Sequence, residues 1–140
     1  MSLKVESKIF KNECMDVDLF NFLSDFTKFT KLLPPEHQSK INATPEECSI
    51  SAGVMGNFTI RYIEKDSPKL IKMGTNSSKE ALTIWIQLKQ IKPYDTRIKV
   101  TISLEIGMMQ KMLIKGKIQQ FADSLAEGIS RIPAYLLRME

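Results

Sequence analysis

From Lys40 to Ile106, apolar residues recur at every second position, and this period is the feature that most constrains the fold. The alternation is clearest between Arg97 and Ile106, where aliphatic residues take turns with polar ones. Alternate residues of a strand face opposite sides, so the run predicts a sheet with one apolar and one polar face. Turn sequences such as Asp66-Ser67-Pro68 and Lys92-Pro93-Tyr94-Asp95 separate the apolar runs. Short turns between consecutive strands predict an antiparallel meander.

The apolar face of such a sheet needs a cover, and the segment from Met108 to Ile132 is long enough to supply it. Its apolar residues fall at helical spacing from Ile114 onward. We expect Ile118–Ile132 to anchor the helix in the core. Three residues of the first two turns lie nearly opposite this stripe and are predicted to face a pocket: Met109, Met112 and Leu113. Gly116, a weak helix former, lies between the two registers. We therefore expect a bend or a close contact there, or else a partly buried, fraying helix start.

The N-terminal third predicts a strand and two short helices. Alternation from Leu3 to Glu13 predicts the strand, and four residues are expected on its inner face: Leu3, Val5, Ser7 and Ile9. Asp16 is predicted to cap the first helix, and Ser24 or Asp25 the second. Pro34-Pro35 is expected to end the second helix.

Composition places the 140 residues in one domain, spanning residues 1–140. The net charge of +4 comes from basic residues that are spread along the chain, so no nucleic-acid partner is predicted. No apolar stretch is long enough to span a membrane, and the N-terminus lacks an apolar signal region. We therefore predict a cytoplasmic protein. Cys14 and Cys48 lack metal-ligand spacing, so they are predicted to be reduced, semi-buried thiols, with no metal and no cofactor.

The order of these elements, a strand, two short helices, antiparallel strands and one long helix, is that of the helix-grip fold. Phe22–Phe29 (FLSDFTKF) resembles the paired short helices of proteins with this fold, and Leu33–Glu36 resembles their following loop. Met108–Leu125, with Gly116 inside it, resembles their terminal helix. The chain thus resembles the SRPBCC superfamily, which includes START domains, Bet v 1 allergens and polyketide cyclase/dehydratase-like proteins, and above all its small bacterial members.

This resemblance implies an α+β fold in which a curved antiparallel sheet wraps around a long C-terminal helix. It also implies an apolar cavity between the two, which in such proteins often holds lipids, sterols or polyketides. We predict that the cavity is lined by residues of the apolar sheet face, a short helix, a turn and the long helix: Phe29, Met55, Phe58, Ile60, Tyr62, Met73, Ile84, Ile86, Ile102, Leu104, Met109, Met112, Leu113 and Gly116. The alternative is that these side chains pack together and fill the core.

The leading functional hypothesis is therefore non-catalytic binding of a hydrophobic small molecule or lipid. A cyclase- or dehydratase-like enzyme is the second hypothesis, and it would need polar groups in the cavity, with Tyr62, His37 and Thr75 as the first suspects. No catalytic residue is predicted, because the apolar wall offers no acid, base or nucleophile beside Tyr62. The third hypothesis is a protein-interaction module, or a homodimer, that uses the polar sheet face around Trp85.

Overall fold

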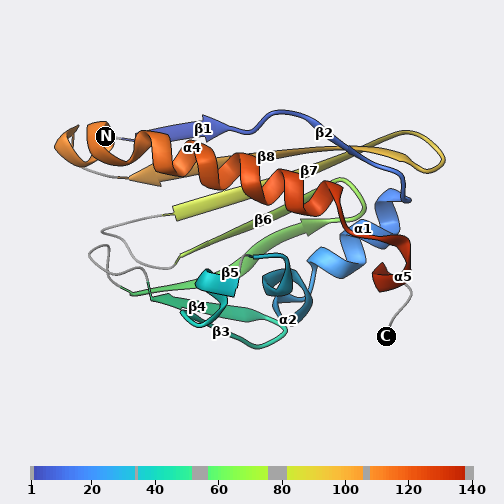
Figure 1. Cartoon of the computed structure of the whole chain (residues 1–140), viewed down its shortest axis with the longest axis horizontal. Coiled ribbons are helices and arrows are strands. Elements are labelled where there is room, and N and C mark those ends of the chain that lie inside the picture. The colour runs from blue at the N-terminus through green and yellow to red at the C-terminus, as the bar shows by residue number, and fades with distance from the viewer. Residues whose placement is uncertain (1, 34, 52–56, 76–81, 106–107, 138–140) are drawn as a thin grey trace.

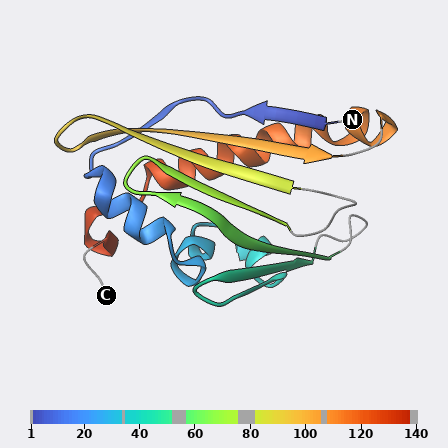
Figure 2. The same cartoon turned by 180° about the vertical axis from the view of Figure 1, so that it is seen from behind.

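One antiparallel sheet curves around one long helix in the computed structural model of the protein (Figures 1 and 2). The structure describes residues 2–33, 35–51, 57–75, 82–105 and 108–137, and only the backbone of residues 2, 37 and 108–113. Within these residues the sheet has eight strands: β1 (Ser2–Glu6), β2 (Phe10–Asn12), β3 (Ile41–Ala43), β4 (Glu47–Ser51), β5 (Asn57–Asp66), β6 (Leu70–Thr75), β7 (Leu82–Lys92) and β8 (Asp95–Glu105).

The strand order confirms the predicted meander. Strands β3 to β8 pair with their chain neighbours in sequence, and β1 closes the order as β1-β8-β7-β6-β5-β4-β3. Strand β2 pairs with β8 as well, beyond the end of β1. All of these pairings are antiparallel. The architecture is therefore the predicted α+β arrangement of a sheet around a C-terminal helix.

Helices lie at both ends of the chain: α1 (Asp16–Leu23), α2 (Phe26–Phe29), the 3-10 turn η1 (Thr30–Leu32), α3 (Pro35–Gln38), α4 (Met108–Ser130) and α5 (Ala134–Leu137). The predicted cap of the second helix is confirmed, because Asp25 Oδ1 accepts hydrogen bonds from the N–H (2.9 Å) and hydroxyl (2.6 Å) of Thr27. The predicted cap of the first helix is wrong. Asp16 is the first residue of α1, and Met15 occupies the cap position. No helix among the described residues is long and apolar enough to cross a membrane.

The core lies between the inner face of the sheet and the helices. Cross-strand pairs such as Ile84 with Ile102 and Ile86 with Val100 place the predicted apolar face on this side. These side chains form one buried cluster with Leu19 of α1 and with residues of α4. The alternation in the sequence therefore identified the inner face of β7 and β8 correctly.

The predicted first strand, Leu3–Glu13, is interrupted. Leu3, Val5 and Ser7 are buried, as expected, but Ile9 is 67% exposed. The ladder breaks at Ser7, whose Oγ accepts the N–H of Val100 at 2.9 Å and so takes the place of a backbone partner. When pairing resumes in β2, Phe10 lies opposite Ile98. Before the break the odd-numbered residues face the core, and after it the even-numbered ones do. Ile9 therefore lies outside the core.

Helix α4 packs on one side of the sheet, against β8, β1 and β2, and also touches η1 (Figure 1). Its buried residues belong to the C-terminal part: Ala122, Leu125, Ala126 and Ile129. Side chains of the helix also bind the backbone of the N-terminal segment. The amide of Gln119 donates to Glu6 O at 2.7 Å, and Asp123 Oδ1 accepts from the N–H of Lys8 at 2.8 Å. These bonds pair backbone groups at a sheet edge that would otherwise be open.

Asn12 joins the end of α4 to the sheet. Its buried amide nitrogen donates to Ile129 O at 2.9 Å and to Ile132 O at 3.2 Å. Carbonyls at the end of a helix lack partners within the helix, and a buried carbonyl without a partner is costly. Replacing Asn12 with alanine is therefore expected to lower the free energy of unfolding by about 1–3 kcal/mol. Urea unfolding measures this, with the exposed Asn42→Ala as a control that should change it little. Equal losses in the two variants would contradict the role of Asn12.

Candidate functional site

The long helix α4 covers only part of the inner face of the sheet. Helix α4 packs on the β8, β1 and β2 side, whereas β3, β4 and β5 lie at the other end of the strand order. Ile50 and Phe58 are direct cross-strand partners on β4 and β5, and both are only half-buried. Further half-buried apolar residues border the core on β3, β7 and the first half of α4: Ile41, Ala43, Leu82, Ile114 and Ile118. We refer to these seven residues as the half-open apolar rim.

The structure divides the residues predicted to line a cavity. Seven of them are at most 6% exposed and belong to the packed core: Phe29, Ile60, Met73, Ile84, Ile86, Ile102 and Leu104. Phe58 and Tyr62 are half-buried. The side chains of Met109, Met112 and Leu113 lie outside the described part of the structure, although their backbone is helical, and Met55 lies wholly outside it. Sequence reasoning did not include Ile50 of the rim among the lining residues, although the alternation in β4 already placed it inward.

Gly116 departs from its predicted surroundings. The residue is exposed, and a Cβ atom built on it would have no atom within 4 Å. The expected close contact is therefore wrong. Helix α4 is assigned as one element from Met108 to Ser130, and its burial changes along its length. Ile114 and Ile118 are half-buried, whereas Ala122 and Leu125 are buried. The anchoring half thus begins near Ala122, one turn later than predicted.

Tyr62 is held by three neighbours. Its ring stacks on Phe26 with centroids 4.2 Å apart, and Lys65 Nζ lies 4.2 Å from its centroid. Its hydroxyl donates to Leu23 O at 2.6 Å. Burial, together with the nearby Asp25 carboxylate, raises the pKa of Tyr62 well above its usual value. The phenol is therefore neutral at physiological pH, and its proton already has an acceptor.

Cys48, Thr75 and His37 are the other candidates for proton transfer near the inner face. Burial raises the pKa of the Cys48 thiol to about 11, so the thiol is protonated at neutral pH. Thr75 Oγ1 accepts the N–H of Leu82 at 3.0 Å. His37 lies in α3, and its side chain is outside the described part of the structure. Cys14 and Cys48 are 7% and 3% exposed, so both are more deeply buried than the predicted semi-buried thiols, and the described residues contain no cluster that could hold a metal.

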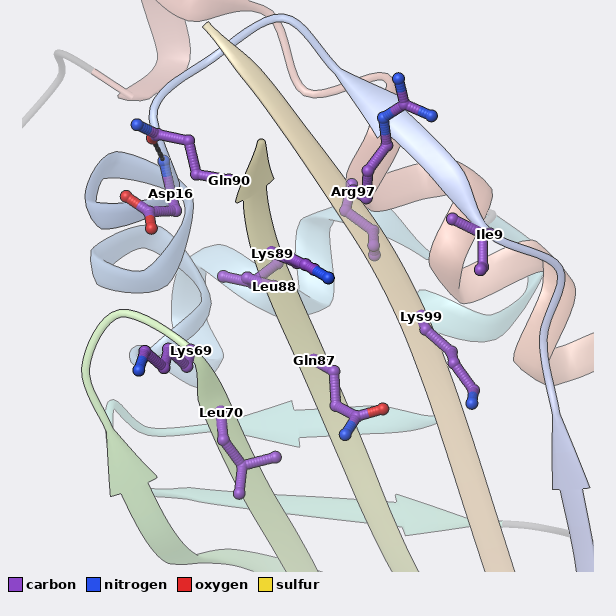
Figure 3. Close-up of a pocket in the computed structure, with 11 residues that line it drawn as sticks. Ile9, Asp16, Lys69, Leu70, Gln87, Leu88, Lys89, Gln90, Arg97 and Lys99 are labelled. Carbon is purple, nitrogen blue, oxygen red and sulfur yellow. Dashed lines mark hydrogen bonds between the residues drawn. The ribbon is translucent and has the colours of Figure 1, made fainter. Parts of the chain in front are cut away.

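A hollow lies on the outer face of the sheet, and Figure 3 shows its lining. This outer groove has a volume of about 570 Å³ and runs over β6, β7 and β8. Gln87 lies opposite Lys99, and Lys89 lies opposite Arg97, in the register of β7 and β8. The groove is bounded by Ile9 of the link between β1 and β2 and by the start of α1, where the N–H of Asp16 donates to Gln90 Oε1 at 2.9 Å (Figure 3). The outer groove was not predicted.

Trp85 occupies the polar face of β7, as its strand position predicted, but two lysines accompany it. Lys4 Nζ and Lys72 Nζ each lie 5.8 Å from the indole centroid. Lys72 is the cross-strand partner of Trp85 on β6, and the indole is half-buried. Cation–π contacts of this kind stabilise an aromatic ring on a wet surface. They account for Trp85 without a partner chain, and the predicted homodimer through this face stays a hypothesis.

Comparison with solved structures identifies the fold. Norcoclaurine synthase from Thalictrum flavum, in complex with dopamine and hydroxybenzaldehyde, matches with a TM-score of 0.70 at 12% identity, over 100% of this chain and 89% of that one. A START superfamily protein from Mycobacterium smegmatis matches with a TM-score of 0.61 at 14% identity, over 93% of this chain and 99% of that one. The chain has the helix-grip fold. Neither a protein-family model nor a curated protein sequence matches it.

The helix-grip fold confirms the predicted resemblance to START and Bet v 1-like proteins at the level of architecture. At these identities the likeness extends to the backbone and says nothing of particular residues. In this helix-grip chain the rim and the outer groove differ in character. The rim was defined by its apolar residues, and two of them, Ile41 and Ala43, also border polar side chains such as Thr27 and Gln38. The outer groove combines apolar and cationic side chains.

Proposed function

We propose that the protein binds a hydrophobic small molecule or lipid against the inner face of the sheet, beside the first half of α4, without transforming it. The observation that carries this proposal is the half-open apolar rim. Ile50 and Ile118 pack against the core but are only half-buried, and half-buried Phe58 lies opposite Ile50. Small-molecule sites are largely apolar hollows with few polar groups, and the rim has this composition.

The uneven packing of α4 supports the same reading. Its second half is buried in the core, so this part is a fixed wall. Its first half carries half-buried Ile114 and Ile118 beside the exposed Gly116. A helix segment whose described side chains are only half-buried, as at Ile114 and Ile118, opens at lower free energy than a buried one, which favours entry of a guest there. The fold supports the proposal too, since the synthase with the same architecture is in complex with two small aromatic compounds.

The inner face supports binding better than catalysis. A catalytic site needs an acid, base or nucleophile with a matched pKa and a free position. Among the described residues of this face, Tyr62 donates its proton to Leu23 O, and Cys48 has a pKa of about 11. Neither group can exchange a proton easily at neutral pH.

Ligand binding is testable with the purified full chain. Native mass spectrometry and solvent extraction are expected to find a bound apolar compound, or titration with a panel of fluorescent fatty acids and aromatic compounds is expected to saturate. Replacing Phe58 with alanine removes apolar surface from the rim and should raise Kd about tenfold, since burying an aromatic side chain contributes about 1.5–3 kcal/mol. Stability should change less than binding, because Phe58 is only half-buried.

Ile63→Ala is the matched control. Ile63 lies on the same strand, β5, as Phe58, but its side chain is exposed on the outer face of the sheet. Truncating the Ile63 side chain should therefore leave Kd within about twofold of the original value. A protein that is empty on purification and ignores the whole panel would overturn the proposal. So would equal effects of the Phe58 and Ile63 changes on Kd.

A further inference from the structure

The outer groove has the size and lining of a binding site separate from the inner face. Its volume of about 570 Å³ falls within the range of roughly 300–1,000 Å³ that small-molecule sites occupy. Ile9 and Leu70 supply apolar surface at two of its sides, and Ile9 is 67% exposed. Gln87 lies between them on β7, as Figure 3 shows. An exposed aliphatic side chain beside a hollow is a natural contact for an apolar guest.

Four cationic side chains line the groove, and they fall into two kinds. Arg97 is paired with Asp95 at 2.9 Å, and its hydrogen bond holds the pKa of Asp95 below the usual value. Lys99 is paired with Glu6 at 3.2 Å. For the other two cations, Lys69 and Lys89, the structure shows no ion pair with any described residue. These two ammonium groups are therefore available to an anion from outside.

One carboxylate, that of Asp16, also lines the groove, and its surroundings partly offset its negative charge. Asp16 stands in the first turn of α1, where its Oδ1 accepts the N–H of Val17 at 2.7 Å. The start of a helix carries partial positive charge, so this carboxylate is partly compensated in place. The exposed lysines Lys69 and Lys89 then leave the groove with an excess of positive charge. An anion in the groove can accept a hydrogen bond from a lysine ammonium group or from the Gln87 amide.

We propose that the outer groove binds a small carboxylate that carries an apolar body. Its head is attracted to the ammonium groups of Lys69 and Lys89, and its apolar part contacts Ile9. This site is independent of the inner-face site. The groove is assembled from the link between β1 and β2, the start of β6 and the β7–β8 hairpin, so it exists only in the folded chain.

The test uses the full chain labelled with ¹⁵N and titrated with naphthalene-2-carboxylate. Amide resonances of Leu70, Gln87 and Lys99 are expected to shift with a single Kd, and added salt should weaken binding. The neutral isostere naphthalene-2-carboxamide should bind more weakly. The double variant Lys69→Gln/Lys89→Gln should raise Kd for the carboxylate about fivefold and leave that for the carboxamide unchanged. Ile9→Ser should weaken both compounds.

The matched control is Lys115→Gln/Lys117→Gln, which makes the same change of charge at two exposed positions of α4. Its Kd for the carboxylate should stay within about twofold of the original. Shifts confined to inner-face amides such as those of Ile50 and Phe58 would overturn the groove site while supporting the inner site. Equal Kd values for the two double variants would overturn it as well, because binding would then follow net charge alone.

Discussion

Replacing Leu125 with alanine is expected to lower the free energy of unfolding by about 2–5 kcal/mol. Leu125 is 3% exposed and lies among the buried residues of α4 that pack on the sheet. Truncation there removes buried methyl groups and leaves a cavity that neighbours fill only in part. The same change at Ile118, about two helical turns earlier, should cost only about 1 kcal/mol, because that side chain is half-buried and loses less contact.

Urea or thermal unfolding of the two variants measures the difference. The comparison is internal, since both positions lie in one helix and both changes create alanine, a strong helix former. Leucine and isoleucine differ in helix propensity by only a few tenths of a kcal/mol, about 0.2–0.4, which is too little to explain the expected gap. Equal losses in the free energy of unfolding would show that α4 is a uniform core element. The division of the helix into a buried C-terminal half and a half-buried N-terminal half would then be wrong.

The sequence predicted the parts of the fold that depend on local periodicity. Ile98, Val100 and Ile102 alternate strictly, and the structure buries all three. The error at Ile9 has a different origin. It depends on the hydroxyl of Ser7 taking the N–H of Val100, and this contact joins residues that are far apart in the chain. Period-two counting cannot detect such a break, because the apolar pattern continues through it.

The inner face and the outer groove show the same limit for function. The apolar inner face could be inferred, because each strand contributes its own alternation. The extent of its cover could not, because it depends on where α4 lies across the strand order. The outer groove brings together Ile9, Lys69 and Lys89, and its outline depends on a break in the first strand that the sequence did not indicate. Sites built from long-range neighbours need the fold before they can be recognised.

Two glycines should respond in opposite directions to the same change. Gly74 is buried in β6, and a Cβ atom there would lie 2.7 Å from Leu82 O and 2.9 Å from Ile63 Cδ1. The isoleucine tip can turn aside, since it is exposed, but the carbonyl belongs to the neighbouring strand and moves only with the sheet. Gly74→Ala is therefore expected to lower the free energy of unfolding by about 1–3 kcal/mol. At Gly116 the added methyl meets nothing within 4 Å, so Gly116→Ala should raise stability by about 0.5–1 kcal/mol.

Comparing Gly74→Ala with Gly116→Ala separates two reasons for a glycine in this chain, namely lack of space for a side chain and flexibility of the backbone. If Gly74 is required by the approach of β7, its alanine variant loses stability while the unfolded chain is affected in the same way as at Gly116. Denaturant unfolding of both variants isolates the contact in the folded state. A stabilised Gly74→Ala variant would mean that β6 and β7 can separate at this point without cost. A destabilised Gly116→Ala variant would mean that α4 needs glycine there for a reason other than space, such as flexibility of its first half.

The rate of ligand binding by Gly116→Ala then becomes the informative measurement. A stiffer first half of α4 should slow the entry of a ligand at the half-open rim without changing the apolar contacts of the bound ligand.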